Sequence, residues 1–228
     1  MLELLRRDLG DCVAVVIVSE REDGDVRPDR VPDGLLIARQ MAMTSSRWVM
    51  LDEVHGVDVH RSDGGTPSSA IAAVGDVLVG GRFAPPVAVW AADCAPVMLF
   101  GEHGVPVACH AGWRGLGAGV IDVAVGAVRR PVVAVLGPCI HPCCYEFGER
   151  ELALVAAGVH VPVETVAGIT SENTLALDVP AAVTAALDRH GIEVVVNDAC
   201  TGCDERWYSH RRGDSGRHAL VGWSEEPS

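Results

Sequence analysis

Segments rich in valine and isoleucine, several of them apolar along their whole length, constrain the fold of this chain more than any other feature. "CVAVVIVS" and "VVAVLGP" have the pattern of strands that are covered on both faces of a sheet. The same reasoning predicts strands over 12–19, 48–54, 86–92, 96–100, 105–111, 132–138 and 193–198. Most of the sheet is therefore expected to lie inside the protein.

Helices are predicted between these strands, over 35–42, 115–130, 147–158 and 179–191. The last has Asp178 as its N-cap, Pro180 in its first turn and Gly191 past its end. This mixture predicts an α/β or α+β fold, a layered sandwich whose mixed central sheet is covered by helices. The 228 residues, 49% of them hydrophobic, show no linker or repeat, so a single domain over 1–228 is expected.

Charge and cysteine content narrow the possible partners. A net charge of −13 argues against nucleic acid and anionic membranes, and no apolar run is long enough to span a bilayer. Binding of a small anionic or neutral ligand remains possible if several cationic side chains lie close together. The N-terminal residues do not resemble a secretion signal, so a cytoplasmic location is expected. There the eight cysteines should be reduced, as metal ligands, nucleophiles or core residues.

Three soft ligands stand near the ends of predicted strands: His55 in "EVHGVDV", Cys94 in "AADCAPVML" and His110 in "ACHAGWRG". Two imidazoles and a thiolate suit catalytic zinc, with a fourth position left for water or substrate, and they also tolerate copper. A second interpretation makes Cys94 a nucleophile, His110 its base and Asp93 a nearby acid. In a third, all of these residues are buried core. Cys109 precedes His110 in the strand, so it is expected on the opposite face, in the core.

Two further stretches carry cysteines, and two carry cations. "GPCIHPCCYEFGE" could bind a separate metal, but a rigid turn that presents Tyr145 and Glu146 is favoured. "CTGC" is a single pair and is interpreted as cysteines packing a turn. Arg114 opens a predicted helix, where anions bind, and the basic stretch with His210 and Arg212 could supply the other side of a phosphate site.

Taken in order, "EVHGVDV", "ADCAPVML", "HAGWRGLGAGV", "GPCIHPCCYEFGE" and "CTGCDERWYSHRRGDSGR" resemble the laccase-domain family. This family is also called multicopper polyphenol oxidase-like or peptidoglycan editing factor. Its members are mostly described as zinc-dependent purine nucleoside phosphorylases with adenosine deaminase and methylthioadenosine phosphorylase activity. The resemblance implies a layered α/β fold and zinc bound by His55, Cys94 and His110. It also matches Arg21 to an arginine of the family, whereas Glu53 stands where glutamine is usual and the N-terminal region is short.

The expected function is therefore a zinc-dependent purine nucleoside phosphorylase and adenosine deaminase acting on adenosine, inosine and methylthioadenosine, as a monomer or homodimer. Its partners would be a nucleoside and phosphate. Asp93 and Glu146 are expected to move protons. The expected contacts to substrate and phosphate are Arg21, Arg114, Tyr145, His210 and Arg212. Three alternatives remain: a copper polyphenol oxidase, a hydrolase that edits peptidoglycan precursors, and a metal-binding protein without catalysis.

Overall fold

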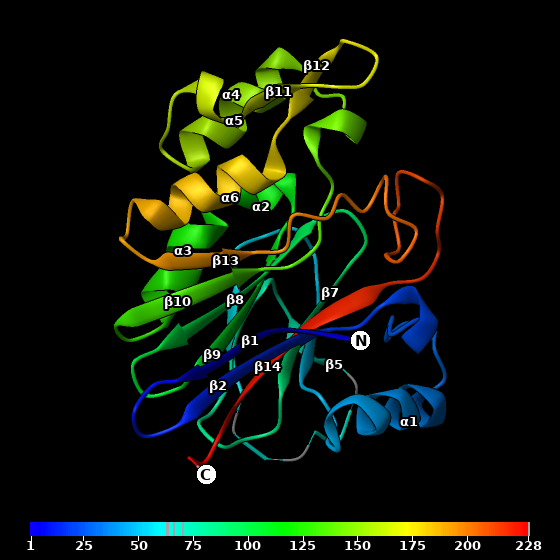
Figure 1. Cartoon of the computed structure of the whole chain (residues 1–228), viewed down its shortest axis with the longest axis vertical. Coiled ribbons are helices and arrows are strands. Elements are labelled where there is room, and N and C mark those ends of the chain that lie inside the picture. The colour runs from blue at the N-terminus through cyan, green and yellow to red at the C-terminus, as the bar shows by residue number, and fades with distance from the viewer. Residues whose placement is uncertain (63, 66, 70, 228) are drawn as a thin grey trace.

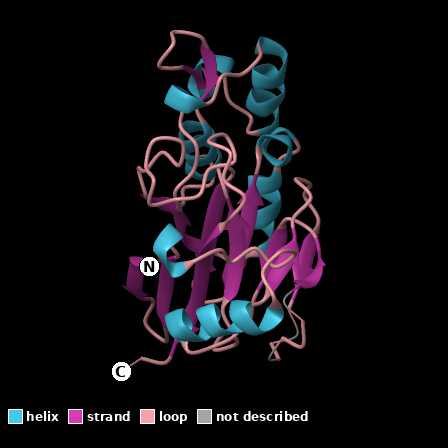
Figure 2. Ribbon diagram, turned by 90° about the vertical axis from the view of Figure 1, so that its right-hand side faces the viewer, coloured by secondary structure: helices cyan, strands magenta, loops and turns pink. Residues whose placement is uncertain are grey.

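Two β-sheets packed face to face form the middle of the molecule, and helices cover the outer face of each (Figure 1). The structure is a computed structural model that describes residues 1–62, 64–65, 67–69 and 71–227. From top to bottom, Figure 1 shows a helical layer, a first sheet, a second sheet and a single helix. The side view in Figure 2 shows the strands enclosed between these helices.

The first sheet has six strands in the order β13-β10-β8-β9-β6-β4. They are β4 (Val59–Arg61), β6 (Val77–Val79), β8 (Ala95–Gly101), β9 (Pro106–Ala111), β10 (Pro131–Leu136) and β13 (Glu193–Val196). Its two outer pairs are parallel and the inner pairs antiparallel, so the sheet is mixed. Every residue of β8 is buried, because Val97 and Leu99 face the helices while Met98 and Phe100 face the other sheet.

The second sheet has four antiparallel strands in the order β1-β2-β14-β7. They are β1 (Leu2–Asp8), β2 (Val13–Val18), β7 (Val87–Ala91) and β14 (His218–Glu225). A Cβ at Gly222 of β14 would lie 2.5 Å from the sulfur of Met98, so the two sheets approach too closely there for a side chain. Buried valines and leucines of both sheets fill the rest of the space between them.

The helical layer on the six-stranded sheet consists of α2 (Trp113–Gly117), α3 (Val120–Ala127), α4 (Glu149–Gly158), α5 (Val163–Val166) and α6 (Val179–Asp188). On the other side, α1 (Asp33–Thr44) packs on the four-stranded sheet through Leu36. The remaining elements are short: η1 (Arg21–Asp23), η2 (Pro142–Cys144), β3 (Met50–Asp52) with β5 (Ile71–Val74), and β11 (Ala167–Ile169) with β12 (Leu175–Leu177). Among the described helices, none has the length and apolar character needed to cross a bilayer.

The structure confirms the layered mixed α/β fold but divides the predicted central sheet into two sheets. The helix predicted over 115–130 is also wrong in detail. It begins at Trp113 and is broken into α2 and α3 at Gly119, whose φ of 82° lies outside the helical region. Strands β1 and β14 were not predicted, because β1 mixes charged residues into its apolar pattern and β14 contains His218, Gly222 and Trp223. The predicted N-cap is confirmed, since Asp178 accepts a hydrogen bond of 2.9 Å from the backbone N–H of Ala181.

Candidate metal centre and anion pocket

His55, Cys94 and His110 come together beside the connection from β7 to β8, where the chain passes from the four-stranded to the six-stranded sheet. His55 lies in the loop after β3, Cys94 directly before β8, and His110 in β9. Their ligand atoms all lie within 4.8 Å of one another, and the Cys94 sulfur is 3.7 Å from Nε2 of His55. The two imidazole rings meet edge to face, with centroids 4.7 Å apart. The structure thus brings together the three residues that sequence reasoning selected as metal ligands.

The backbone is shaped around this group. His55 has a φ of 63° and Asp93, next to Cys94, a φ of 93°, values that residues with side chains seldom adopt. Gly112 passes so close that a Cβ there would lie 2.6 Å from Cδ2 of His55 and 3.2 Å from the sulfur of Cys94. Gly112, the first glycine of "HAGWRG", is therefore required by the close approach of the backbone to two of the three candidate ligands.

A buried carboxylate, that of Asp76, holds the ring of His110 and the backbone at His55. Oδ1 of Asp76 lies 2.8 Å from Nδ1 of His110, and the side chain also accepts hydrogen bonds from the backbone N–H groups of His55 and Gly56. With Nδ1 of His110 donating to this carboxylate, Nε2 is the ring nitrogen that would offer a lone pair to a metal ion once its proton is lost. A carboxylate behind a histidine is the usual arrangement around a metal, because it sets the tautomer and the ring orientation.

A second buried carboxyl group stands on the other side of His110. Oε2 of Glu53 is 3.8 Å from Nε2 of His110, while Oε1 accepts a hydrogen bond of 2.9 Å from the backbone N–H of Trp90. Burial raises the pKa of Glu53 to about 8, although the charge of His110 and the Trp90 hydrogen bond act in the opposite direction. Glu53 therefore binds a proton more tightly than an exposed glutamate does.

The electrostatics of this group favour a thiolate at Cys94. Burial alone would raise the pKa of this thiol, but the charge on His110 and hydrogen bonds with both imidazoles lower it to about 6. For His110, burial acts to lower the pKa, and the negative charges of Glu53 and Cys94 and the Asp76 hydrogen bond raise it well above its usual value. A pair of opposite charges is thus stabilised inside the protein.

The donor set fits a single soft or borderline metal ion. Two imidazole nitrogens and one thiolate match the ligands of catalytic zinc, which keeps a fourth position for substrate or water. Asp76 supplies the carboxylate that usually stands behind a metal-binding histidine. All three ligands also line a cavity, through which a substrate or water could reach the metal ion. These residues support a metal-binding site.

The cavity has a volume of about 490 Å³ and carries an excess of cations. Besides the three ligands, its lining includes Arg27, Arg114, Arg211, Arg217 and His210, together with the aromatic side chains of Trp90, Trp113 and Tyr145. In a chain with a net charge of −13, four arginines around one cavity concentrate positive charge. Such a cavity favours an anionic group that is attached to, or bound beside, a flat ring.

Three of these arginines, Arg114, Arg211 and Arg217, form no ion pair with an acidic side chain within the described part of the chain, and two of them stack on aromatic rings. The guanidinium of Arg114 lies 4.4 Å from the ring centre of Trp113, and that of Arg211 lies 5.2 Å from the ring centre of Tyr145. Stacking on aromatic faces holds both groups in place and leaves their N–H donors available. Arg27, by contrast, pairs with Asp29, and Arg217 donates to backbone carbonyls near it.

The other predicted site residues divide into two groups. Asp93, Tyr145 and His210 line the cavity with Arg114. Asp93 is nearly buried, and its carboxylate accepts hydrogen bonds from the Thr201 hydroxyl, 2.7 Å away, and from the backbone N–H of Arg211, 2.6 Å away. It therefore ties the loop that carries His210 and Arg211 to the start of β8.

Arg21, Arg212 and Glu146 do not line this cavity. Arg21 and Arg212 both form ion pairs with Asp214, at 2.5 and 2.8 Å, and donate to backbone carbonyls, so they hold the C-terminal loop in shape. Glu146 is exposed and lines a neighbouring depression beside Cys143 and Cys144. Ion pairing and exposure, rather than distance in the sequence, keep these three out of the cavity.

Sequence reasoning missed Asp76 and the cavity contacts of Glu53, Arg211 and Arg217. A signal for Asp76 was present, because a lone acid in "AVGDVLVGG" stands directly before a buried strand and such a group needs a partner. Glu53 was noted only for replacing a glutamine. Arg211 and Arg217 lie in the basic stretch that was selected, but nothing in the sequence distinguishes the side chains that turn toward the cavity from those that turn away.

Comparison with known proteins supports this description. Residues 24–225 match the family described as multi-copper polyphenol oxidoreductase laccase. The chain belongs to this laccase-like family. One relative of the laccase-like family, the protein named purine nucleoside phosphorylase from Streptomyces coelicolor, is 36% identical over 198 residues, or 82% of this chain and 79% of that protein. Purine nucleoside phosphorylase YlmD from Geobacillus stearothermophilus is 30% identical over 224 residues, or 89% of this chain and 82% of YlmD.

Two solved structures share the fold. A Neisseria meningitidis protein has a TM-score of 0.76 at 23% sequence identity, covering 96% of this chain and 98% of that one. The crystal structure of YlmD from Geobacillus stearothermophilus has the same TM-score at 21% identity, covering 98% of this chain and 100% of YlmD. The resemblance to the laccase-domain family is thus confirmed in sequence and in fold.

Proposed function

We propose that this protein is a zinc-dependent purine nucleoside phosphorylase. The proposal rests on Arg114 and Arg211, which have no acidic partner among the described residues and line one cavity with the ligand group His55, Cys94 and His110. Relatives of the laccase-like family that carry the name purine nucleoside phosphorylase support it from an independent direction.

In phosphorolysis, an oxygen of phosphate bonds to C1′ of the ribose while the bond from C1′ to the purine nitrogen breaks, and the base takes up a proton. Arg114 and Arg211 have the planar, charged donors that bind phosphate in two-point contacts. Holding phosphate beside the sugar converts an encounter between two solutes into a reaction within one complex. The aromatic rings of Trp90, Trp113 and Tyr145 offer faces for the flat base.

In this proposal His55, Cys94 and His110 hold the zinc ion. Bound there, zinc would supply a Lewis acid and lower the pKa of water. Asp76 fixes the His110 ring, and Glu53 can hold a proton on Oε2 beside that ring. Asp93 acts by positioning, since both of its oxygens hold the loop of Arg211.

The finer expectations belong to the same proposal. Adenosine, inosine and methylthioadenosine share a purine joined to a ribose-type ring, and the cavity is large enough for such a nucleoside together with phosphate. Deamination of adenosine would use the same zinc and the same base site. None of the eight cysteines forms a disulfide in the described structure, which agrees with a reducing, cytoplasmic location.

The test uses protein reconstituted with zinc, incubated separately with adenosine, inosine and methylthioadenosine, with and without phosphate. We expect phosphate-dependent release of the free base together with a pentose 1-phosphate, followed by chromatography. Appearance of inosine from adenosine without phosphate would add the deaminase activity. Absence of base release from all three nucleosides, with zinc bound, would contradict the proposal. Oxygen uptake with a phenol, or release of an amino acid from a muramyl peptide, would replace it with an oxidase or a peptidoglycan-editing hydrolase.

A further inference from the structure

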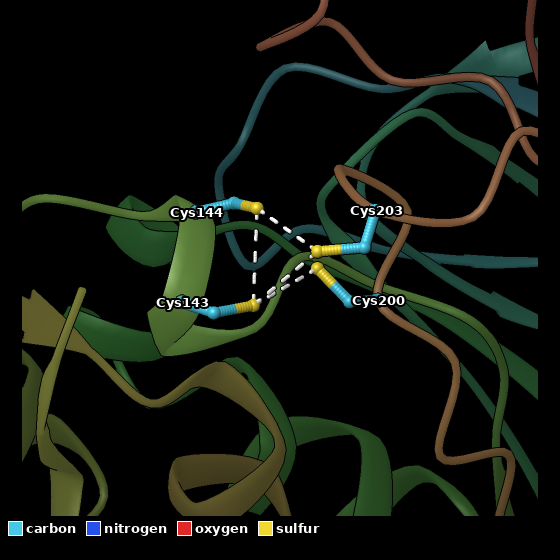
Figure 3. A group of neighbouring side chains, drawn as sticks. All are labelled: Cys143, Cys144, Cys200 and Cys203. Atoms are coloured by element: carbon cyan, nitrogen blue, oxygen red, sulfur yellow. Dashed lines mark hydrogen bonds between the residues drawn. The ribbon is translucent and has the colours of Figure 1, made fainter. Parts of the chain in front are cut away.

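Four cysteines outside the cavity form a second group of candidate metal ligands. Cys143 and Cys144 belong to η2, whereas Cys200 and Cys203 belong to the "CTGC" turn. Cys200 follows Cys143 by 57 residues in the sequence. A parallel bridge between Cys139 and Cys200 sets the two segments side by side. Figure 3 shows the four sulfur atoms turned toward one another from these two segments.

The distances between the sulfur atoms match the edges of a small tetrahedron. They are 3.3 Å from Cys144 to Cys203, 3.6 Å from Cys143 to both Cys200 and Cys203, and 3.8 Å from Cys143 to Cys144. All four atoms lie within 4.8 Å of one another. Four thiolates around one zinc ion, each about 2.3 Å from it, stand about 3.8 Å apart. One ion therefore fits, without room for a cluster of several metals.

The surrounding backbone is built for close contact with sulfur. The backbone N–H of His141 donates to the sulfur of Cys200 at 3.4 Å. A Cβ at Gly202 would lie 2.8 Å from Cβ of Cys144 and 2.9 Å from its sulfur, so this glycine lets the turn close against η2. The Ser171 hydroxyl and the Ser171 backbone N–H both donate to the carbonyl oxygen of Cys143, at 3.0 and 3.1 Å.

Positive charge also lies beside the group. Arg212 donates to the carbonyl oxygens of Thr201 and Gly202 within the turn, and Arg211 and Arg212 line the depression that exposes Cys143 and Cys144. Glu146 and Glu172 line the same depression. Four thiolates on a divalent ion leave a charge of −2, and the two guanidinium groups offset part of it, although Arg212 also pairs with Asp214.

We propose that Cys143, Cys144, Cys200 and Cys203 bind one zinc ion as a structural site, separate from His55, Cys94 and His110. Four sulfur ligands complete the tetrahedral shell and leave no position for a substrate, as in structural zinc sites. In this proposal the "CTGC" cysteines are ligands as well as residues of a turn, and the ligand set is built from both stretches instead of from "GPCIHPCC" alone.

The ion would fix one wall of the cavity. Cys144 directly precedes Tyr145, and Cys203 begins the loop that leads to Arg211, whose guanidinium stacks on the Tyr145 ring. A bond network through one metal therefore joins the two segments that carry this stacked pair. Since only the folded chain brings the four sulfurs together, bound zinc stabilises the fold.

The first test counts zinc in unaltered protein that has been purified without chelators. Native mass spectrometry should find two zinc ions per chain. The double variant His55→Ala/His110→Ala should keep one, and X-ray absorption at the zinc edge should show four sulfur neighbours at about 2.3 Å. Loss of all zinc from this variant, nitrogen or oxygen ligands on the remaining ion, or a disulfide between Cys144 and Cys203 in protein kept free of oxygen would overturn the proposal.

The second test removes one ligand. Cys203→Ser changes the most exposed of the four cysteines and should reduce the zinc count from two to one while lowering Tm by more than about 5 °C. Its control is Cys12→Ala, a buried cysteine of neither group, which should keep both ions. If Cys203→Ser does not fold, the zinc count and the absorption spectrum of the unaltered chain still decide. Retention of two zinc ions by a folded Cys203→Ser variant would contradict the site.

Discussion

The two groups of candidate metal ligands in this protein both contain cysteine, but they differ in their other ligands, in the groups around them and in their access to the cavity. The group His55, Cys94 and His110 mixes nitrogen with sulfur, has the buried carboxyl groups of Asp76 and Glu53 beside it and opens to a cavity with four arginines. The four-cysteine group of Cys143, Cys144, Cys200 and Cys203 contains only sulfur, is contacted mainly by backbone groups and borders a shallow depression at the surface.

This difference is the one that separates catalytic metal sites from structural metal sites. Three ligands of mixed type leave a position open and let neighbouring charges tune protonation, whereas four thiolates fill the coordination shell. In these proposals cysteine has two different tasks near one cavity, because Cys94 lines it whereas Cys144 of the four-cysteine group directly precedes Tyr145 of its lining. Variants on the two sides should therefore change different properties of the protein.

The largest effect is expected from His110→Ala. It removes a ligand and leaves the buried Asp76 carboxylate without its partner, so base release should fall at least about 100-fold and one of two zinc ions should be lost. The zinc count and the rate are measured on the same preparation. Near-normal turnover with that ion missing would show that the group does not serve catalysis.

Arg114→Ala and Arg211→Ala should each raise KM for phosphate about tenfold, because each removes a charged donor worth about 1.4 kcal/mol or more. KM for the nucleoside should change less, and both zinc ions should remain. Arg150→Ala, an exposed arginine of α4 outside the cavity, is the matched control. Equal effects of all three substitutions would point to overall charge instead of a phosphate site.

A pair of glycine variants compares the two groups directly. Gly112→Ala places a Cβ against His55 and Cys94 and should reduce turnover, while Gly202→Ala places one against Cys144 and should lower Tm. Each insertion is expected to cost about 1–3 kcal/mol in packing. Gly126→Ala adds a Cβ where no atom lies within 4 Å and should leave both properties unchanged or raise Tm slightly. An effect of Gly202→Ala on turnover alone would reverse the assignment.

The smallest effect is a difference in thiol titration, measured on metal-free protein. The pKa of Cys94 is lowered to about 6, and burial and the neighbouring thiols raise the pKa of Cys143 to about 12. The thiolate is the reactive form, so alkylation of Cys94 should rise as pH increases through about 6, whereas Cys143 should stay unreactive at neutral pH. Mass spectrometry of peptides from a pH series measures the alkylation of each cysteine. Equal pH dependence of alkylation at Cys94 and Cys143 would contradict the difference between the two groups.

The fold was predictable where a buried element has a distinctive local sequence pattern. The strand around Val97 and the helix capped by Asp178 follow from local pattern, and so do the apolar neighbours of His110. The division into two sheets did not follow, since a strand covered by helices and one covered by a second sheet are equally apolar. Strand β14 was missed because its neighbours in space, not its own residues, make it a strand.

The candidate site shows the same limit. His55, Cys94 and His110 were selected because each is a soft ligand at the end of an apolar strand. Their supporting carboxyl groups, Asp76 and Glu53, were missed, because partnership between buried charges appears only in three dimensions. The four-cysteine group was divided between two motifs for a related reason: it exists only through the pairing of Cys139 with Cys200.

Strand β14 has a consequence for synthesis on the ribosome. It follows every other strand in the sequence, yet it lies between β2 and β7 in the four-stranded sheet. Until residues 218–225 have been translated, the growing chain carries two apolar strands whose shared neighbour does not yet exist. A nascent chain halted before this point therefore displays exposed strand edges, which are targets for chaperones and seeds for aggregation.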